Sequence, residues 1–371
     1  MKIENFELER MQSTWENVVE YNLAESGVHP VALEEFFTPA ERRALIRLGL
    51  GYSQTNGTPE LRKNIARFYP GIDLDQIQVT TGSTEANFLL MWSLLEPGDE
   101  IVFELPNYLQ MWGLARGFGA KVKPFHLREE NSWAPDLEEL GRAVTRKTKL
   151  IVLTNPNNPT GAVLSAEEMR EIVRIARQAG AWILADEIYQ GAEREGGRTP
   201  SFWGCMNKVI CVNGLSKAFG LAGLRIGWIA GPPRLIRSVW PRHDYTSICP
   251  SILSDTLARI ALSPIRRDRL LRRTRAILNT NYPVLESWLK KHRETFRFVP
   301  PRAGAIAFCG YNLGLDSIEL ALRIIRDQSV FLAAGDLFAV GRHLRIGFGA
   351  ETTRFKAALA RIDRVLEALK K

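Results

Sequence analysis

Residues 213–228 read Asn-Gly-Leu-Ser-Lys-Ala-Phe-Gly-Leu-Ala-Gly-Leu-Arg-Ile-Gly-Trp and place a lysine and an arginine in one glycine-rich loop. Lys217 follows an apolar run that is typical of a strand. A lysine with apolar and aromatic neighbours loses its proton more readily and can then attack an aldehyde. The planar guanidinium of Arg225, further along the loop, can bind a phosphate. A surface lysine in a structural loop is the alternative, so this interpretation needs support from other parts of the chain.

A carboxylate at the end of a second apolar run supplies the first support. Residues 184–189 read Leu-Ala-Asp-Glu-Ile-Tyr, and Asp186 ends the predicted strand. The carboxyl ends of parallel strands are where α/β sheets place ligand-binding groups. A buried carboxylate needs a cationic or hydrogen-bonding partner, which a protonated ring nitrogen of a ligand would supply. A helix cap or an Asx turn is the structural alternative.

A third segment, residues 154–161, reads Thr-Asn-Pro-Asn-Asn-Pro-Thr-Gly and also follows a predicted strand. Its prolines and glycine favour a rigid turn, and its asparagine side chains can donate to a ligand oxygen. Taken alone, this segment is explained equally well as a plain structural turn.

Together these segments resemble the class I/II aminotransferases, which are fold-type I enzymes dependent on pyridoxal phosphate (PLP). The order of N-P-N-N-P-T-G, D-E-I-Y and S-K-x-F-G-L-x-G-L-R-I-G-W carries the resemblance, which extends from about residue 22 to residue 345. It implies that Lys217 forms the Schiff base and later moves a proton, and that Asp186 pairs with the pyridine nitrogen. It also implies that Asn158 and Tyr189 bind the 3-oxygen of the cofactor and that Arg225 binds its phosphate.

Further residues match the family outside these three segments. Residues 81–86 open a predicted helix after a strand, and free N–H groups there favour an anion, so Ser83 and Thr84 are candidate phosphate ligands. The resemblance implies that Tyr108 stacks on the pyridine ring and takes part in catalysis. It implies that Tyr52 reaches the phosphate of a neighbouring subunit, which would make the protein a homodimer with shared active sites. Arg345 would bind the α-carboxylate of the substrate, in a bidentate manner.

One departure from the family concerns the phosphate. The family usually has Ser or Thr three positions before the lysine, whereas this chain has Gly214. We therefore expect one phosphate hydrogen bond to be missing or to come from water.

The segment expected at the substrate entrance departs from the family as well. Residues 25–29 read Glu-Ser-Gly-Val-His, and Gly27 is a candidate substrate contact together with Asn158. This segment, with Asp244 and Tyr245 downstream, is similar to capreomycidine synthase, a PLP enzyme that cyclises a hydroxylated arginine. Glu25 would then face a cationic side chain, although a solvated loop carboxylate is an equal alternative.

Two functions therefore stay open. The first is an aminotransferase that moves an amino group between an amino acid and a 2-oxo acid, and the second is PLP-dependent elimination or cyclisation of an arginine-type substrate. A non-enzymatic regulator of the same fold would be expected to carry a DNA-binding domain, and no helix-turn-helix segment is visible before residue 22.

Composition indicates which classes of partner and which cellular location to expect. The net charge of +8 comes from scattered basic residues, so no nucleic-acid partner is expected. No apolar stretch is long enough for a membrane span, no signal peptide is visible at the N-terminus, and no metal site is indicated. The four cysteines form no C-x-x-C pair and suit reduced, buried thiols in a cytoplasmic protein.

Alternating short apolar runs and amphipathic helices in residues 77–230 predict an α/β fold with a mostly parallel, seven-stranded sheet. From residue 264 an Arg-rich helix and short strands predict a smaller α+β domain. The expected division is an N-terminal helix and arm over residues 1–37 that packs with the small domain, a large PLP-binding domain over 38–263, and the small domain over 264–371.

Overall fold

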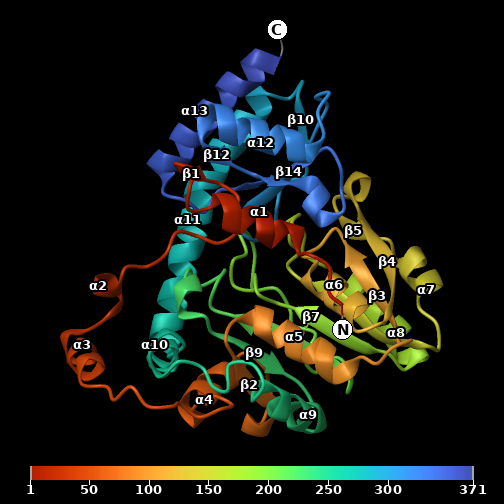
Figure 1. The fold of residues 1–371 in the computed structure, drawn as a ribbon, viewed down its shortest axis with the longest axis vertical. Helices are drawn as coiled ribbons and strands as arrows, with labels where there is room; N and C mark the ends of the chain where they lie inside the picture. Colours follow the sequence, from red (N-terminus) through yellow and green to blue (C-terminus); the bar gives the residue numbers. More distant parts are fainter. Residues whose placement is uncertain (1, 370–371) are drawn as a thin grey trace.

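The computed structural model describes residues 2–369, and two sheets organise this part of the chain (Figure 1). The strands of the larger sheet are β2 (Ile77–Thr80), β3 (Glu100–Leu105), β4 (Lys121–Arg128), β5 (Ala134–Pro135), β6 (Thr148–Thr154), β7 (Trp182–Asp186), β8 (Val209–Gly214) and β9 (Gly227–Ala230). Their spatial order is β2-β9-β8-β7-β6-β3-β4-β5.

The middle of the larger sheet is parallel and buried. Strands β4, β3, β6, β7 and β8 run parallel to one another, whereas β9, β2 and β5 pair antiparallel with their neighbours. The predicted mostly parallel, seven-stranded sheet is confirmed by β2, β3, β4, β6, β7, β8 and β9, and the short strand β5 adds an eighth at its edge. The eighth strand, β5, has two residues, one of them a proline, and so short a strand leaves no alternating pattern in the sequence.

Helices cover both faces of this sheet, which explains why its central strands are continuous apolar runs. They are α4 (Pro59–Ala66), α5 (Ser83–Leu94), α6 (Gln110–Gly117), α7 (Leu137–Ala143), α8 (Ala166–Ala179), α9 (Pro233–His243) and α10 (Ile252–Ala261). A capping box starts α8, because Ser165 and Glu168 each accept a hydrogen bond from the backbone N–H of the other.

The smaller sheet is antiparallel, with the order β10-β11-β14-β13. Its elements are α11 (Pro264–Lys291), β10 (Phe296–Phe298), β11 (Ile306–Tyr311), α12 (Ser317–Gln328), β12 (Val330–Phe331), β13 (Ala333–Ala334), β14 (His343–Gly347) and α13 (Thr352–Leu369). Arg345 lies on β14, between two other strands, so it is not a charge on an exposed sheet edge.

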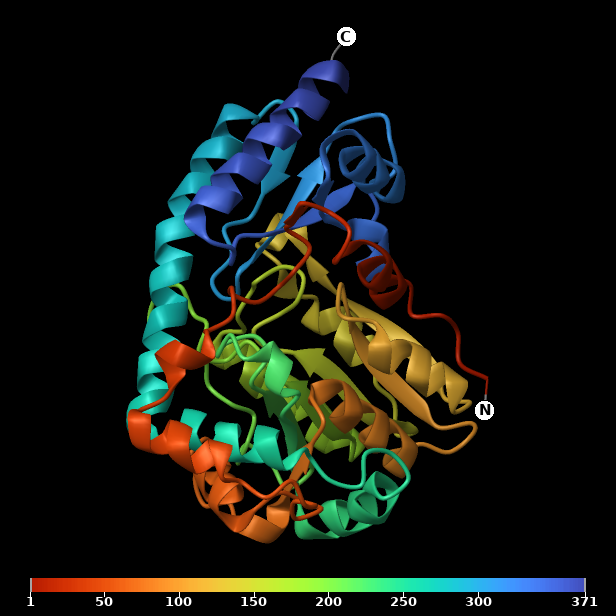
Figure 2. The same ribbon diagram turned by 60° about the vertical axis from the view of Figure 1, so that its left-hand side comes forward.

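The N-terminal segment crosses between the two sheets. It contains α1 (Glu7–Trp15), β1 (Tyr21–Asn22), α2 (Leu33–Phe36) and α3 (Pro39–Ile46). Strand β1 pairs parallel with β12, which ties the segment to the C-terminal part of the chain. In Figures 1 and 2 the segment, drawn in red, passes between the smaller sheet and the larger one. This arrangement supports the proposed division at residues 37 and 263, which remains a prediction.

Two further properties of the described residues concern location. No helix within residues 2–369 has both the length and the apolar character needed to cross a membrane. All four cysteines are free thiols; Cys211 and Cys309 are buried, whereas Cys205 and Cys249 are only half-buried.

Candidate active site

A cavity of about 520 Å³ brings together most of the residues predicted from the sequence. Its lining comes from the N-terminal segment, from the carboxyl ends of strands in the larger sheet and from β14. Nine of the eleven predicted residues line it, namely Ser83, Thr84, Tyr108, Asn158, Asp186, Tyr189, Lys217, Arg225 and Arg345. Parallel strands end at one edge of a sheet, which is why residues far apart in sequence meet here.

Lys217 follows β8, and its amine faces a carboxylate. Its Nζ lies 2.8 Å from Oε1 of Glu25, a residue 192 positions away in the chain. Burial lowers the pKa of Lys217, but the charges of Glu25 and Tyr189 outweigh it, so this pKa lies above its ordinary value. The prediction that Lys217 loses its proton more readily is therefore wrong for the protein without cofactor. Its neighbours in sequence gave no sign of this long-range ion pair.

Asp186 ends β7 and is a buried carboxylate without a cation. One of its oxygens accepts a hydrogen bond from the N–H of Ile188 at 3.0 Å. Burial raises the pKa of Asp186 to about 6, because no positive charge among the described residues offsets the loss of water. A protonated pyridine nitrogen would supply that missing charge, so the residue fits the PLP ring.

Four side chains and a helix end form a phosphate-sized anion site, here called the phosphate cup: Ser83, Thr84, Ser216 and Arg225. Ser83 and Thr84 begin α5, where backbone N–H groups and the helix dipole favour an anion. Nη1 of Arg225 lies 3.5 Å from Oγ of Ser216.

Glycines keep the phosphate cup open. A Cβ on Gly82, whose φ is +81°, would lie 2.5 Å from Nη2 of Arg225, and a Cβ on Gly227 would lie 2.4 Å from the backbone nitrogen of Ser83. Side chains at these two positions would displace the guanidinium or the start of α5. The donors and the available space therefore fit the phosphate of PLP.

The structure gives a physical reason for Gly214. A Cβ on Gly214 would lie 2.9 Å from the carbonyl oxygen of Ile226 and 3.1 Å from Cδ1 of Ile188, so the backbone leaves no room for a hydroxyl-bearing side chain. Ser216 is the hydroxyl from this loop that does line the cavity.

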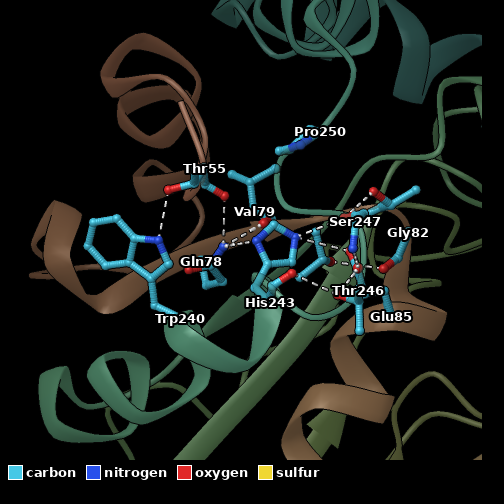
Figure 3. Close-up of polar contacts among 12 residues, drawn as sticks. Thr55, Gln78, Val79, Gly82, Glu85, Trp240, His243, Thr246, Ser247 and Pro250 are labelled. Atoms are coloured by element: carbon cyan, nitrogen blue, oxygen red, sulfur yellow. Dashed lines mark hydrogen bonds and ion pairs between the residues drawn. The ribbon is translucent and has the colours of Figure 1, made fainter. Parts of the chain in front are cut away.

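A buried polar network supports the phosphate cup from behind (Figure 3). His243, the last residue of α9, has its Nε2 3.0 Å from Oγ of Ser247 and 3.3 Å from Oε2 of Glu85. Glu85 accepts hydrogen bonds from the N–H of Thr81, just before α5, and from the hydroxyl of Thr246. Burial raises the pKa of Glu85, but its hydrogen bonds, led by the one from His243, lower it to about 2.

A second network supports the turn that carries Asn158. Glu104 is fully buried and accepts hydrogen bonds from Asn157 at 2.8 Å, from the N–H of Thr154 at 3.1 Å and from Asn107 at 3.2 Å. Burial raises the pKa of Glu104 to about 8, which these hydrogen bonds only partly oppose.

At the other end of the cavity Arg345 forms a preorganised cation. It is 1% exposed; its Nη1 donates to Oδ1 of Asn158 at 2.8 Å and its Nη2 to the carbonyl of Ala24 at 2.5 Å. Its guanidinium also lies over the ring of Phe338, 4.8 Å from the centroid. The Nε has no partner among the described residues, which leaves a buried donor for a ligand oxygen.

Two tyrosines, Tyr108 and Tyr189, line the cavity. The hydroxyl of Tyr108 donates to Oε1 of Glu9 at 2.8 Å, and the ring of Phe6 packs edge-on against it at 4.8 Å. Tyr189 is buried, and Ser26 hydrogen-bonds with its hydroxyl. Burial raises the pKa of both tyrosines.

Two predicted residues lie outside the cavity lining. Tyr52 is 88% exposed and does not reach the cavity of its own chain. Gly27 is buried next to the cavity, and its N–H donates to Oε1 of Glu25 at 2.7 Å, so it positions a lining residue.

The sequence gave no indication of the lining residues in α1. Glu9 and Glu16 belong to a helix and loop without a recognisable motif, and only their position across the cavity reveals them. His243 and Glu85 were missed because their partners come from separate elements of the chain.

Comparison with known proteins places this geometry in a family. The family "Aminotransferase class I and II" matches residues 26–362. Capreomycidine synthase from Streptomyces vinaceus is 30% identical over 93% of this chain and 89% of its own length, and an aspartate/prephenate aminotransferase from Thermus thermophilus is 28% identical over 94% of both. The crystal structure of a PLP-dependent aminotransferase from Streptococcus suis superimposes with a TM-score of 0.94 at 32% identity, covering all of both chains.

The fold, the cavity and these similarities agree with one another. The chain therefore belongs to the class I and II aminotransferase family and is an enzyme dependent on pyridoxal phosphate.

Proposed function

We propose that the protein transfers an amino group between an amino acid and a 2-oxo acid, with the cofactor held as a Schiff base on Lys217. The observation that carries this proposal is the convergence of a lysine amine, an unpaired buried Asp186, a phosphate cup and the buried Arg345 on one cavity. When bound, PLP accepts the electron pair released at the substrate Cα.

The side chains of this chain would divide the binding of the cofactor among them. The phosphate cup binds the phosphate through the start of α5 and the guanidinium of Arg225. Asp186 keeps the pyridine nitrogen protonated because a neutral ring would leave the buried carboxylate unpaired. Asn158 and Tyr189 bind the 3-oxygen, and Tyr108 packs on the ring.

Two cations would act on the substrate. Arg345 binds the α-carboxylate, and its contacts with Asn158 and Ala24 fix the guanidinium before the substrate arrives. The Nζ of Lys217, once free of the cofactor, lies in the same cavity and can carry a proton to and from the substrate Cα.

The test is a half-reaction with the purified, PLP-loaded protein. Amino acids of different side-chain charge are added singly, without an acceptor, and the absorbance spectrum is recorded. We expect the yellow band of the lysine-bound cofactor to bleach with at least one donor and to return when a 2-oxo acid is added. A protein that takes up no PLP, or a band that no donor bleaches, would contradict the proposal.

The similarity to capreomycidine synthase favours one second function, namely elimination or cyclisation of an arginine-type substrate. In that case the yellow band would persist through turnover of the substrate. Mass spectrometry would detect a cyclised product formed with release of water or ammonia. Adding a 2-oxo acid would leave the absorbance spectrum unchanged.

We also propose a homodimer in which Tyr52 reaches the phosphate of the partner. The exposure of Tyr52 supports this, since it contributes nothing to its own cavity. Mixed dimers of Tyr52→Ala and Lys217→Ala chains would contain one intact site, so mixing two weakly active variants should restore activity. Activity that stays at the average of the two variants would refute the sharing of sites. A cytoplasmic location is likewise proposed, supported by the four free thiols.

A further inference from the structure

The charges around the cavity do not balance once each proposed task is assigned. The charged lining residues are the cations Lys217, Arg225 and Arg345 and the acids Glu9, Glu16, Glu25 and Asp186. Under the proposed function Arg225 meets the phosphate, Arg345 the α-carboxylate, Lys217 the aldehyde and Asp186 the pyridine nitrogen. Three carboxylates from the N-terminal segment, Glu9, Glu16 and Glu25, remain without a task, and together they are called the acidic wall.

The three carboxylates of the acidic wall have few partners. Glu25 pairs with the amine of Lys217 at 2.8 Å and accepts a hydrogen bond from the N–H of Gly27 at 2.7 Å, and Glu9 accepts one hydrogen bond from the neutral hydroxyl of Tyr108. Within residues 2–369 no side chain donates a hydrogen bond to the carboxylate of Glu16. Burial, followed by the like charges of Glu25 and Glu9, raises the pKa of Glu16, and the charge of Lys217 opposes this only in part, so the three carboxylates repel one another.

Lys217 shows that Glu25 can hold a cation, but this partner is not permanent. The free ammonium group offers three N–H donors, whereas a Schiff-base nitrogen offers at most one. Linking Lys217 to the cofactor therefore leaves Glu25 with unused acceptor capacity, close to Glu16 and Glu9.

An independent feature, the side chain of Arg345, offers a binding site for an anionic ligand group in the same cavity. Arg345 is buried, faces the cavity and keeps its Nε without a partner among the described residues. An amino acid that binds Arg345 through its α-carboxylate has the rest of its atoms inside the same cavity. Among the described residues that line the cavity, the acidic wall holds the only charged groups to which neither the cofactor nor the α-carboxylate has been assigned.

We infer that the acidic wall selects amino donors whose side chain ends in a cation, such as a guanidinium or an ammonium group. The inference rests on the proposed function and names its substrate class. A cation opposite Glu16 and Glu25 would relieve their mutual repulsion, whereas the second carboxylate of a dicarboxylic donor would add to it. Glu9, Glu16 and Glu25 are thus specificity-determining residues.

The first test compares donors of equal shape and different charge. We expect kcat/KM for arginine to exceed that for its neutral analogue citrulline about tenfold or more, and lysine to exceed norleucine similarly. Glu25→Gln should lower the arginine-to-citrulline ratio about tenfold and the half-buried Glu16→Gln about fivefold. Because Glu25 also contacts Lys217, the ratio is the readout and not the absolute rate.

Glu7→Gln is the matched control, since Glu7 lies on α1 but is exposed and does not line the cavity. It should leave the ratio within about twofold of the original value, well below the tenfold that corresponds to 1.4 kcal/mol. A ratio near one in the unmodified protein, or a ratio that neither Glu16→Gln nor Glu25→Gln changes, would overturn the inference.

A second test does not depend on turnover. 4-Guanidinobutyrate and the neutral 4-ureidobutyrate both carry a carboxylate for Arg345, and neither has an amine that can react with the cofactor. In calorimetric titrations of the PLP-loaded protein, the guanidinium compound should bind about tenfold tighter, and Glu16→Gln should reduce this preference. Equal affinities would refute the acidic wall as a cation site.

The outcomes separate the two proposals. A protein that exchanges amino groups equally well with aspartate, citrulline and arginine would overturn the acidic wall's role and leave the aminotransferase intact. A protein that binds 4-guanidinobutyrate preferentially but exchanges no amino group with any donor would overturn the proposed function alone.

Discussion

The two ends of the cavity are built in opposite ways. At the phosphate cup, polar groups behind the site are paired inside the protein, as in the network of His243, Glu85 and Ser247 (Figure 3). At the acidic wall, by contrast, the carboxylate of Glu16 accepts no hydrogen bond from the described residues, and the cation that pairs with Glu25 is the lysine that the cofactor would occupy. The phosphate cup, whose supporting groups are paired, is suited to hold a cofactor permanently. The acidic wall, whose carboxylates are partly unpaired, is suited to bind a substrate that comes and goes.

This difference also follows the parts of the chain from which the two ends are built. The cup and Asp186 lie on the sheet and on α5, which the fold-determining segments build. The acidic wall lies on the N-terminal segment, which crosses between the sheets and is tied down by the pairing of β1 with β12. The residues proposed for the cofactor therefore come from the sheet and its loops, and those proposed for substrate choice come from the N-terminal segment.

The largest effect is expected from Lys217→Ala, which removes the link between the two ends. Activity should fall about 10⁴-fold, because Lys217 is the only lysine among residues 2–369 that lines the cavity and can move the proton. Steady-state kinetics would measure this loss. Lys208→Ala, which removes a lysine bonded to the carbonyl of Gly180 away from the cavity, is the control. Activity within about tenfold of normal in Lys217→Ala would contradict the assignment.

Asp186→Asn should lower the activity of the enzyme without lowering the stability of the fold. Loss of the charge that holds the pyridine nitrogen should lower kcat about 10²–10³-fold. The cofactor-free protein should gain about 3 kcal/mol at neutral pH, because burial raises the pKa of Asp186 from 3.8 to about 6 and its ionisation therefore opposes folding. Chemical unfolding and kinetics on the same samples test both. A variant that loses stability and activity together would show that Asp186 is a structural residue.

Glu104→Gln should change how the stability of the protein depends on pH. The folded protein keeps the proton of Glu104 up to about pH 8, whereas an unfolded chain releases it near 4.5, so the folded state binds more protons between these values. The unfolding free energy therefore falls as pH rises through this window, by about 1.4 kcal/mol per pH unit from this group. The unfolding free energy of Glu104→Gln should therefore fall less steeply with pH, by about 1.4 kcal/mol per pH unit. Urea unfolding between pH 5.5 and 7.5, a range of about two pH units, measures both slopes. Equal slopes would show that Glu104 is ionised in the fold.

The smallest effect is expected behind the phosphate cup. His243→Ala should weaken PLP binding about tenfold, because Glu85 and Ser247 lose the group that holds the start of α5 in place. His243→Asn or Gln should recover part of the affinity by keeping one hydrogen bond. Equilibrium titration of the cofactor-free protein gives the dissociation constant. An unchanged constant, with unfolding midpoints equally unchanged, would remove His243 from the support of the cup.

The sequence was sufficient for every part of the site that a local motif encodes. Asp186 ends β7 and Lys217 follows β8, as the sequence predicts. These predictions succeeded because buried parallel strands are short apolar runs bounded by polar turns.

Contacts between distant segments could not be read in the same way. The ion pair of Lys217 with Glu25 reverses the expected direction of the lysine pKa, although neither residue has an unusual neighbour in sequence. Glu16 belongs to an N-terminal segment whose position depends on the pairing of β1 with β12. Each of these strands has two residues, too few for a recognisable hydrophobic pattern. Their position follows from packing of the whole chain, which local patterns do not encode.

The central claim is that Lys217 carries the cofactor in this cavity. Reducing the PLP-loaded protein with borohydride should fix the cofactor to its lysine, and peptide mass spectrometry should then find the phosphopyridoxyl group on Lys217. A label on Lys217, with Lys208 and the other lysines unmodified, is the predicted result. A protein that retains no label, or that carries it on another lysine, would contradict the account at its centre.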